Sequence, residues 1–138
     1  MKIFSRIIIP VLITLSMIPA SAQKKETTMA YEQISQKEAK SLMDNNKNIV
    51  ILDVRTKKEF DEGHIKVAIN IPVETIGSIP PAQLRDKKQM ILVYCRSGRR
   101  SKMAAQKLGT MGYENVLEFG GIMDWGYGTV KDAPKARK

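Results

Sequence analysis

The residues with the clearest capacity for chemistry lie together, at Cys95 and in the loop that follows it. Cys95 is the single cysteine of the chain, and Arg96, Arg99 and Arg100 come directly after it. A thiolate is a strong nucleophile, and nearby positive charge favours the thiolate over the thiol. Gly98 permits the backbone angles of a tight loop whose amide groups converge on an anion. This cluster predicts a reactive cysteine that acts on a substrate that is anionic or becomes anionic during reaction.

A second interpretation of Cys95 is structural. Buried cysteines often behave as small hydrophobic residues at the end of a core strand. An inert thiol, however, does not require three arginines within the next five residues. We therefore favour the reactive interpretation.

Two continuous apolar runs predict the strands that carry this chemistry. They lie within 48–53 and 90–94, and such runs are typical of strands buried on both faces of a parallel sheet. Asp53 and Arg55 follow the apolar residues of the first run, and Cys95 follows the second run. Ligands of open parallel sheets bind beyond the carboxyl ends of the strands. Both strand ends are therefore candidate parts of one site.

Helical segments alternate with these strands. The capping boxes that begin at Ser35 and Thr56 predict helices at about 36–44 and from 56 to Gly63. Helical spacing predicts a third helix from about Ser101 to 111, whose positive N-terminal end adds to the stabilisation of a thiolate at Cys95. Further short elements are expected as strands at 67–71 and 116–119, a weak helix near 82–84 and a helical turn at 123–125. The alternation predicts an α/β layer with a mainly parallel sheet.

The order and spacing of these segments resemble the rhodanese family of single-domain sulfurtransferases. The matching residues are 52–55 (Leu-Asp-Val-Arg), 59–60, 63–65 (Gly-His-Ile), Ala68, Asn70, Pro72, 93–101, 112–113, 120–121 and Trp125. The resemblance implies an α/β, rhodanese-like fold with a central, mainly parallel, five-stranded sheet flanked by helices. It also implies that Cys95 takes sulfane sulfur from a donor such as thiosulfate and becomes a persulfide. A thiophilic acceptor, such as cyanide, a thiol or a partner protein, then removes that sulfur.

The expected site follows from the loop and from this resemblance. Cys95 is the expected catalytic residue. Substrate binding is expected from backbone amides and side chains of Arg96, Ser97, Gly98, Arg99 and Arg100. Structural support is expected from Asp53, Arg55, His64 and Ser101. Among the arginines, Arg100 precedes the helix and has the alternative of folding back structurally. No cofactor is expected, and one histidine with one cysteine make a multi-ligand zinc site improbable.

Other functions remain open at this point. Cys95 and Arg100 form a C-x4-R loop, whereas the related phosphatases and arsenate reductases use C-x5-R, a position that Ser101 occupies here. A catalytically idle rhodanese-like module that binds a partner or an anion is a further alternative. A thiol-redox protein is the last one, and without a second cysteine it could form only intermolecular disulfides.

The first 22 residues predict a secretory signal peptide. Lys2 and Arg6 precede an apolar stretch at 7–19, and Ala-Ser-Ala at 20–22 is a typical cleavage pattern. That stretch is shorter than the roughly 20 residues of a membrane-spanning helix, so no stable membrane insertion is expected after cleavage. We expect a mature chain that begins at Gln23 and is exported, to the periplasm if the host has an outer membrane and otherwise to the medium.

Composition and net charge limit the class of protein and the kind of partner that the chain can have. The chain has 138 residues, 43% hydrophobic and 27% charged, which fits one folded domain and excludes a disordered chain. We divide it into the signal peptide 1–22, a polar leader 23–30, the rhodanese-like domain 31–130 and a basic tail 131–138. The net charge of +9 favours anionic partners. The expected partners are a small anionic sulfur donor and a thiol or protein sulfur acceptor, with no nucleic acid, for a monomeric protein.

Overall fold

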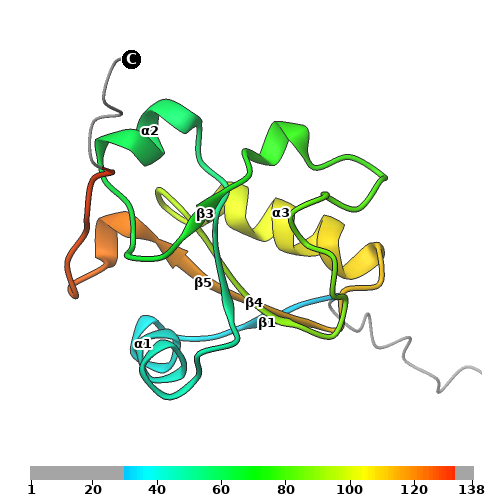
Figure 1. The fold of residues 1–138 in the computed structure, drawn as a ribbon, viewed down its shortest axis with the longest axis horizontal. Coiled ribbons are helices and arrows are strands. Elements are labelled where there is room, and N and C mark those ends of the chain that lie inside the picture. Colours follow the sequence, from blue (N-terminus) through cyan, green and yellow to red (C-terminus); the bar gives the residue numbers. More distant parts are fainter. Residues whose placement is uncertain (1–29, 133–138) are drawn as a thin grey trace, which may run out of the picture.

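A parallel five-stranded sheet forms the centre of the molecule (Figure 1). The computed structural model describes residues 30–132, so the predicted signal peptide and most of the predicted leader and tail lie outside the described residues. The strands are β1 (Glu32–Gln33), β2 (Val50–Asp53), β3 (Ile69–Asn70), β4 (Met90–Cys95) and β5 (Asn115–Gly121). Their order is β1-β5-β4-β2-β3, and every pairing is parallel. The expected α/β class and five-stranded parallel sheet are confirmed.

The first two helices begin where the sequence predicted caps. The elements are α1 (Gln36–Asn45), α2 (Lys57–Glu62), α3 (Arg99–Thr110) and the 3-10 helices η2 (Val73–Thr75) and η3 (Ile122–Asp124). Ser35 and Thr56 both form complete capping boxes, in which each hydroxyl accepts a backbone N–H and a glutamate three residues later accepts the cap's own N–H. None of the helices within residues 30–132 is long and apolar enough to cross a membrane.

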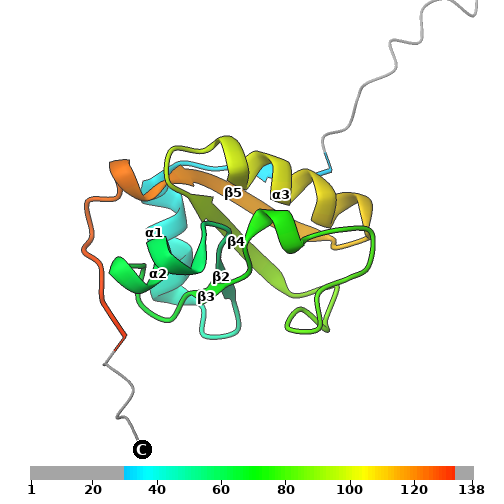
Figure 2. The same cartoon turned by 90° about the horizontal axis from the view of Figure 1, so that it is seen from above.

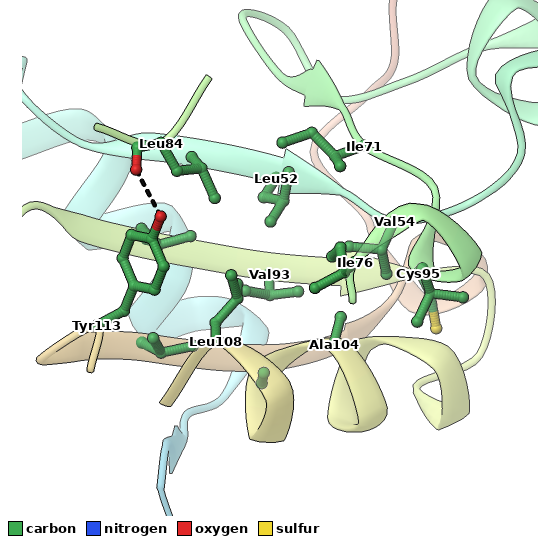
Figure 3. Close-up of a cluster of buried hydrophobic side chains, with 14 residues drawn as sticks. Leu52, Val54, Ile71, Ile76, Leu84, Val93, Cys95, Ala104, Leu108 and Tyr113 are labelled. Atoms are coloured by element: carbon green, nitrogen blue, oxygen red, sulfur yellow. Dashed lines mark hydrogen bonds between the residues drawn. The ribbon is translucent and has the colours of Figure 1, made fainter. Parts of the chain in front are cut away.

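Alternating side chains of the central strands build two cores, one on each face of the sheet. On one face, α3 packs on a cluster that includes Leu52, Val93 and Leu108 (Figure 3). A second cluster, around Leu92 and Tyr94, lies on the opposite face and includes Ala39 of α1. Figure 2 shows α1 and the sheet from above. Because neighbouring residues of a strand point to opposite faces, the continuous apolar runs of the sequence serve both cores at once.

The segment between η2 and β4 differs from the expectation. The predicted weak helix near 82–84 is wrong, because only a single turn forms, closed by the Leu84 N–H and the Pro81 carbonyl at 3.0 Å. The Leu84 side chain is buried, and its carbonyl accepts the hydroxyl proton of Tyr113 (Figure 3). That carbonyl is therefore committed to a tertiary contact and not to a helical bond.

Several boundaries also shift. The strand expected at 67–71 is reduced to Ile69–Asn70, since Val67 has a φ of 63° and leaves the extended conformation. The third helix starts at Arg99, two residues before the predicted start. β1 was not predicted at all, because two residues are too few for an alternating pattern, and only pairing with β5 defines it.

The sheet register sets where the candidate site forms. β4 lies between β2 and β5, with Asp53 opposite Tyr94 and Cys95 opposite Gly121. The carboxyl ends of the three strands therefore meet at one edge, as expected for parallel strands. The β4–β5 ladder is irregular between Val93 and Cys95, where β5 contains one extra residue between Glu118 and Gly121.

Candidate active site

Cys95 is the last residue of β4, directly before the loop that enters α3. Figure 3 shows its sulfur at the end of the core cluster, beside that loop. The residue is only 1% exposed. The Gly98 N–H donates to Sγ at 2.9 Å, and the Ser101 hydroxyl oxygen lies 3.4 Å from Sγ. A buried sulfur that accepts a backbone N–H is arranged to carry negative charge.

Two glycines make this tight loop sterically feasible. Gly98 is the N-cap of α3 and has a φ of 112°, in the left-handed region that side chains rarely adopt. Gly121 lets β5 approach the loop closely, since a Cβ there would lie 2.1 Å from the carbonyl oxygen of Arg96. Larger residues at either position would push the loop away from the Cys95 sulfur.

The loop lowers the pKa of the Cys95 thiol. Burial by itself raises that pKa, because it disfavours the charged thiolate. Hydrogen bonds from Ser101 and from the backbone amides of Gly98 and Ser97 outweigh burial, so the pKa lies below its ordinary value. The positive N-terminal end of α3, a helix of 12 residues, also favours the thiolate and so lowers this pKa. The stabilised thiolate that the sequence predicted thus arises from hydrogen bonds to the sulfur and from the end of α3.

The three loop arginines have different surroundings. Arg96 and Arg99 are exposed, whereas Arg100 is half-buried. Both terminal nitrogens of Arg100 donate to the carboxylate of Glu59, each at 2.8 Å. Arg100 therefore ties the start of α3 to α2, as in the alternative considered from the sequence. Positive charge directed at solvent next to the loop comes from Arg96 and Arg99.

Two clefts flank the loop. One, of about 440 Å³, is lined by Ser97, Arg99 and Arg100 together with residues of η2 and α3. The other, of about 360 Å³, includes Arg96 and Arg55. Another cleft, of about 460 Å³, lies instead against α1, and none of the predicted site residues lines it. The arginines bring positive charge to the two clefts beside the loop, which suits an anionic substrate.

The ion pair between Glu59 and Arg100 leads to a prediction about acid stability. Arg100 lowers the pKa of Glu59 from 4.5 to about 2. The pair's contribution to the free energy of unfolding is complete above pH 4.5 and is lost as the pH falls toward 2. Because the pair is partly exposed, we expect this contribution to be about 1 kcal/mol. Urea unfolding between these two pH values should show a smaller acid-induced loss in Glu59→Gln than in the wild type.

The control for this measurement is Glu62→Gln, which removes an exposed carboxylate from the same helix. It should follow the wild-type dependence on pH. An equal acid-induced loss in Glu59→Gln and wild type would contradict the prediction.

Asp53 and Arg55 form a buried ion pair at the end of β2. Arg55 donates to both carboxylate oxygens of Asp53, with the shortest contact at 2.7 Å, and also to the Gly63 carbonyl at 2.7 Å. Asn70 donates to the carbonyls of Asp53 and Arg55 at 3.0 and 2.9 Å. These contacts join β2, β3 and the end of α2. Asp53 and Arg55 thus hold the frame around the site.

His64 lies outside the Cys95 loop. Its ring stacks on Phe60, with centroids 3.7 Å apart. Its Nδ1 is 2.8 Å from the Phe60 carbonyl, and its Nε2 is 3.3 Å from Asp132. Backbone hydrogen bonds also join His64 to Val130. These contacts attach the C-terminal segment of the described chain to α2.

The structure adds two acidic residues to which sequence reasoning gave no role in the site. Glu59 anchors Arg100, and Glu118 is a buried carboxylate that accepts from the Ser101 hydroxyl at 2.7 Å. A single charge inside the apolar segment 116–119 was the available signal for Glu118. Its partner could not be inferred, because Ser101 lies on another element. Within residues 30–132, no group of three or more metal-ligating side chains comes together.

Comparisons with known proteins point to one family. A model described as the rhodanese-like domain matches residues 35–127. The thiosulfate sulfurtransferase PspE of Escherichia coli (strain K12) is 36% identical over 73 residues, covering 53% of this chain and 70% of PspE. The thiosulfate sulfurtransferase GlpE of Coxiella burnetii (strain RSA 493 / Nine Mile phase I) is 35% identical over 98 residues, covering 70% of this chain and 89% of GlpE.

A solved structure extends the likeness to the fold. It is described as a rhodanese with anions from E. coli, and it superposes with a TM-score of 0.55 at 34% identity. The match covers 60% of this chain and 98% of that one. Neither the phosphatase alternative nor the idle binding module is favoured by these comparisons.

Proposed function

The chain belongs to the rhodanese-like domain family, which includes thiosulfate sulfurtransferases, and from that premise we propose that it is itself a sulfurtransferase. It moves sulfane sulfur from a donor such as thiosulfate to a thiophilic acceptor through a persulfide on Cys95. One observation carries this proposal: the Cys95 sulfur is held 2.9 Å from the Gly98 N–H, at the N-terminus of α3. That environment stabilises a sulfur anion, both as the attacking thiolate and as the resulting persulfide.

The reaction divides into two balanced displacements. The Cys95 thiolate attacks the outer sulfur of thiosulfate, the S–S bond of the donor breaks, and sulfite leaves with the electron pair. Cys95 then carries a persulfide anion. An acceptor nucleophile, cyanide or a thiolate, attacks the terminal sulfur and releases the Cys95 thiolate. Negative charge stays on sulfur at every stage, so the same loop serves both steps.

Intact mass after incubation with thiosulfate tests this proposal. The protein should gain one sulfur atom, and the gain should disappear on addition of cyanide or a small thiol. An unchanged mass with a freely alkylatable Cys95 would refute thiosulfate sulfurtransferase activity.

The exposed arginines support recruitment of an anionic donor, and Arg99→Glu tests it. Arg99 lines a cleft beside the loop. At about 5 Å and an effective dielectric of 20 to 80, one charge pair is worth roughly 1–3 kcal/mol. Reversal of this charge should therefore raise the KM for thiosulfate by about one to two orders of magnitude. Steady-state kinetics at low and high ionic strength should show a stronger salt effect in the wild type than in the variant.

The matched control is Lys47→Glu, the same reversal at an exposed residue that lines the cleft against α1. It should leave the KM nearly unchanged. Unchanged KM in both Arg96→Glu and Arg99→Glu would mean that these arginines do not recruit the donor. The donor would then be a neutral or protein-bound persulfide.

The proposal includes export. The charged start, the short apolar stretch at 7–19 and the Ala-Ser-Ala pattern at 20–22 support cleavage before Gln23. N-terminal sequencing of the protein recovered outside the cytoplasm should begin at Gln23. A retained Met1 in the membrane fraction would contradict export by cleavage.

A further inference from the structure

A buried carboxylate lies behind the nucleophile, and a single hydroxyl bridges the two. Glu118 on β5 is 2% exposed, Ser101 on α3 is fully buried, and Cys95 on β4 is 1% exposed. The Ser101 Oγ lies 2.7 Å from Oε1 of Glu118 and 3.4 Å from the Cys95 Sγ. The three side chains form one connected chain of hydrogen-bonding atoms inside the protein.

The environment of Glu118 fixes this geometry. Its Oε1 also accepts the Gly120 N–H at 2.8 Å, and the amide of Gln33 on β1 lies 3.5 Å from Oε2. On the neighbouring helix α1, the side-chain amide of Gln36 donates to the Phe119 and Gly121 carbonyls and not to Glu118. Neither glutamine is charged. Nothing in these contacts neutralises the carboxylate.

These three hydrogen-bonded side chains have fewer donatable protons than acceptor atoms. Ser101 has one hydroxyl proton, which can be donated to Glu118 Oε1, to the Gly98 carbonyl 2.9 Å away or to the Gly120 carbonyl 3.4 Å away. The sulfur of a Cys95 thiolate, 3.4 Å from Ser101 Oγ, is a further acceptor. If the proton points to an ionised Glu118, the Cys95 thiol can donate only to the Ser101 lone pairs. If it points to a Cys95 thiolate, Glu118 must be protonated and donate to Ser101. The two arrangements differ by a concerted shift of two protons.

We propose that Glu118 is a positioning residue that takes up the proton of the Cys95 thiol through Ser101. The Sγ–H bond breaks as a new bond forms to Ser101 Oγ, and the original Ser101 O–H bond breaks as Oε1 of Glu118 gains that proton. The three side chains together keep a total charge of −1, and no atom is oxidised or reduced. The charge moves from carboxylate to sulfur at the moment of attack. This inference rests on the proposed function and gives the nucleophile an internal proton acceptor.

The other charged groups at this end of the sheet do not compete for that role. They include Asp53, Arg55, Glu59, Arg96, Arg99 and Arg100. Arg55 holds the carboxylate of Asp53, and Arg100 holds that of Glu59. The remaining arginines are exposed cations that favour the thiolate without accepting its proton. Glu118 is therefore the carboxylate connected to the sulfur by hydrogen-bonding atoms.

The rate of Cys95 alkylation by uncharged iodoacetamide, measured from about pH 4 to 9, tests the relay. A proton shared within the pair gives a fixed fraction of thiolate while the pair carries one negative charge. The wild-type rate should thus level off to a plateau over the pH range in which the pair carries one negative charge. In Glu118→Gln and in Ser101→Ala, the rate should instead fall about tenfold for each pH unit below the thiol pKa.

Glu114→Gln is the matched control, since it removes an exposed carboxylate directly before the same strand. It should keep the plateau. A wild-type rate that falls about tenfold per pH unit throughout would overturn the proposal. So would a plateau that survives in Glu118→Gln or Ser101→Ala. If Glu118→Gln fails to fold, the wild type and Ser101→Ala decide the question.

The alkylation profile does not depend on sulfur transfer, so the two proposals fail separately. A plateau in a protein that takes no sulfur from thiosulfate would refute the proposed function and retain the relay. Sulfur transfer without a plateau would refute the relay and retain the function.

Discussion

Cys95→Ser is expected to abolish sulfur transfer from thiosulfate while the protein stays folded. Cys95 is the only thiol of the chain, and a serine hydroxyl cannot form a persulfide. The hydroxyl also ionises far less readily than a thiol, so the loop that stabilises the thiolate cannot rescue it. Removal of a nucleophile should lower the rate by at least about 1,000-fold. Turnover of thiosulfate with cyanide as acceptor measures the effect.

Stability provides the necessary second readout. A serine oxygen at this position can still accept the Gly98 N–H that now donates to sulfur. The free energy of unfolding should therefore change by only about 1 kcal/mol, measured by urea denaturation. Turnover of Cys95→Ser near the wild-type rate would refute the persulfide mechanism. Loss of activity together with loss of folding would be tested with Cys95→Ala, which removes the thiol without burying a new hydroxyl.

Asp53→Ala is expected to be the most damaging single change to stability. The Asp53 side chain is fully buried, and the side chain of Arg55, whose charge it neutralises, is 7% exposed. Removal of Asp53 leaves a buried cation without its counter-charge, which typically costs about 3–5 kcal/mol. Domains of this size have a total stability of about 5–15 kcal/mol. Urea or thermal unfolding should therefore show a large loss, with sulfur transfer lost under conditions where the variant unfolds.

The chain offers a matched control for this experiment. Asp61 forms an exposed ion pair with Lys57 on α2, at 2.8 Å. Asp61→Ala should cost less than about 1 kcal/mol. The double variant Asp53→Ala/Arg55→Met should regain part of the lost stability, because the unpaired charge is gone. Equal losses in Asp53→Ala and Asp61→Ala would contradict a central role for the buried pair.

The sequence determined those features that depend on neighbouring residues. Ser35 and Thr56 were identified as caps because a capping box needs only four consecutive residues. The apolar runs that end at Asp53 and Cys95 became two adjacent parallel strands. Gly98 took the left-handed conformation that the loop requires. Local backbone geometry and hydrophobic pattern are properties of short segments, so they can be read without the fold.

Contacts between distant elements were decided by the tertiary structure alone. Arg100 binds Glu59, which lies 41 residues away, and the sequence left open whether Arg100 faces substrate or folds back. Ser101 meets Glu118, 17 residues away, because α3 packs against β5 beside the end of β4. In the segment near Leu84, a hydroxyl from Tyr113 replaced the bond that a helix would have used. Such pairings depend on how the sheet and helices pack, since side chains far apart in sequence meet only after the chain has folded.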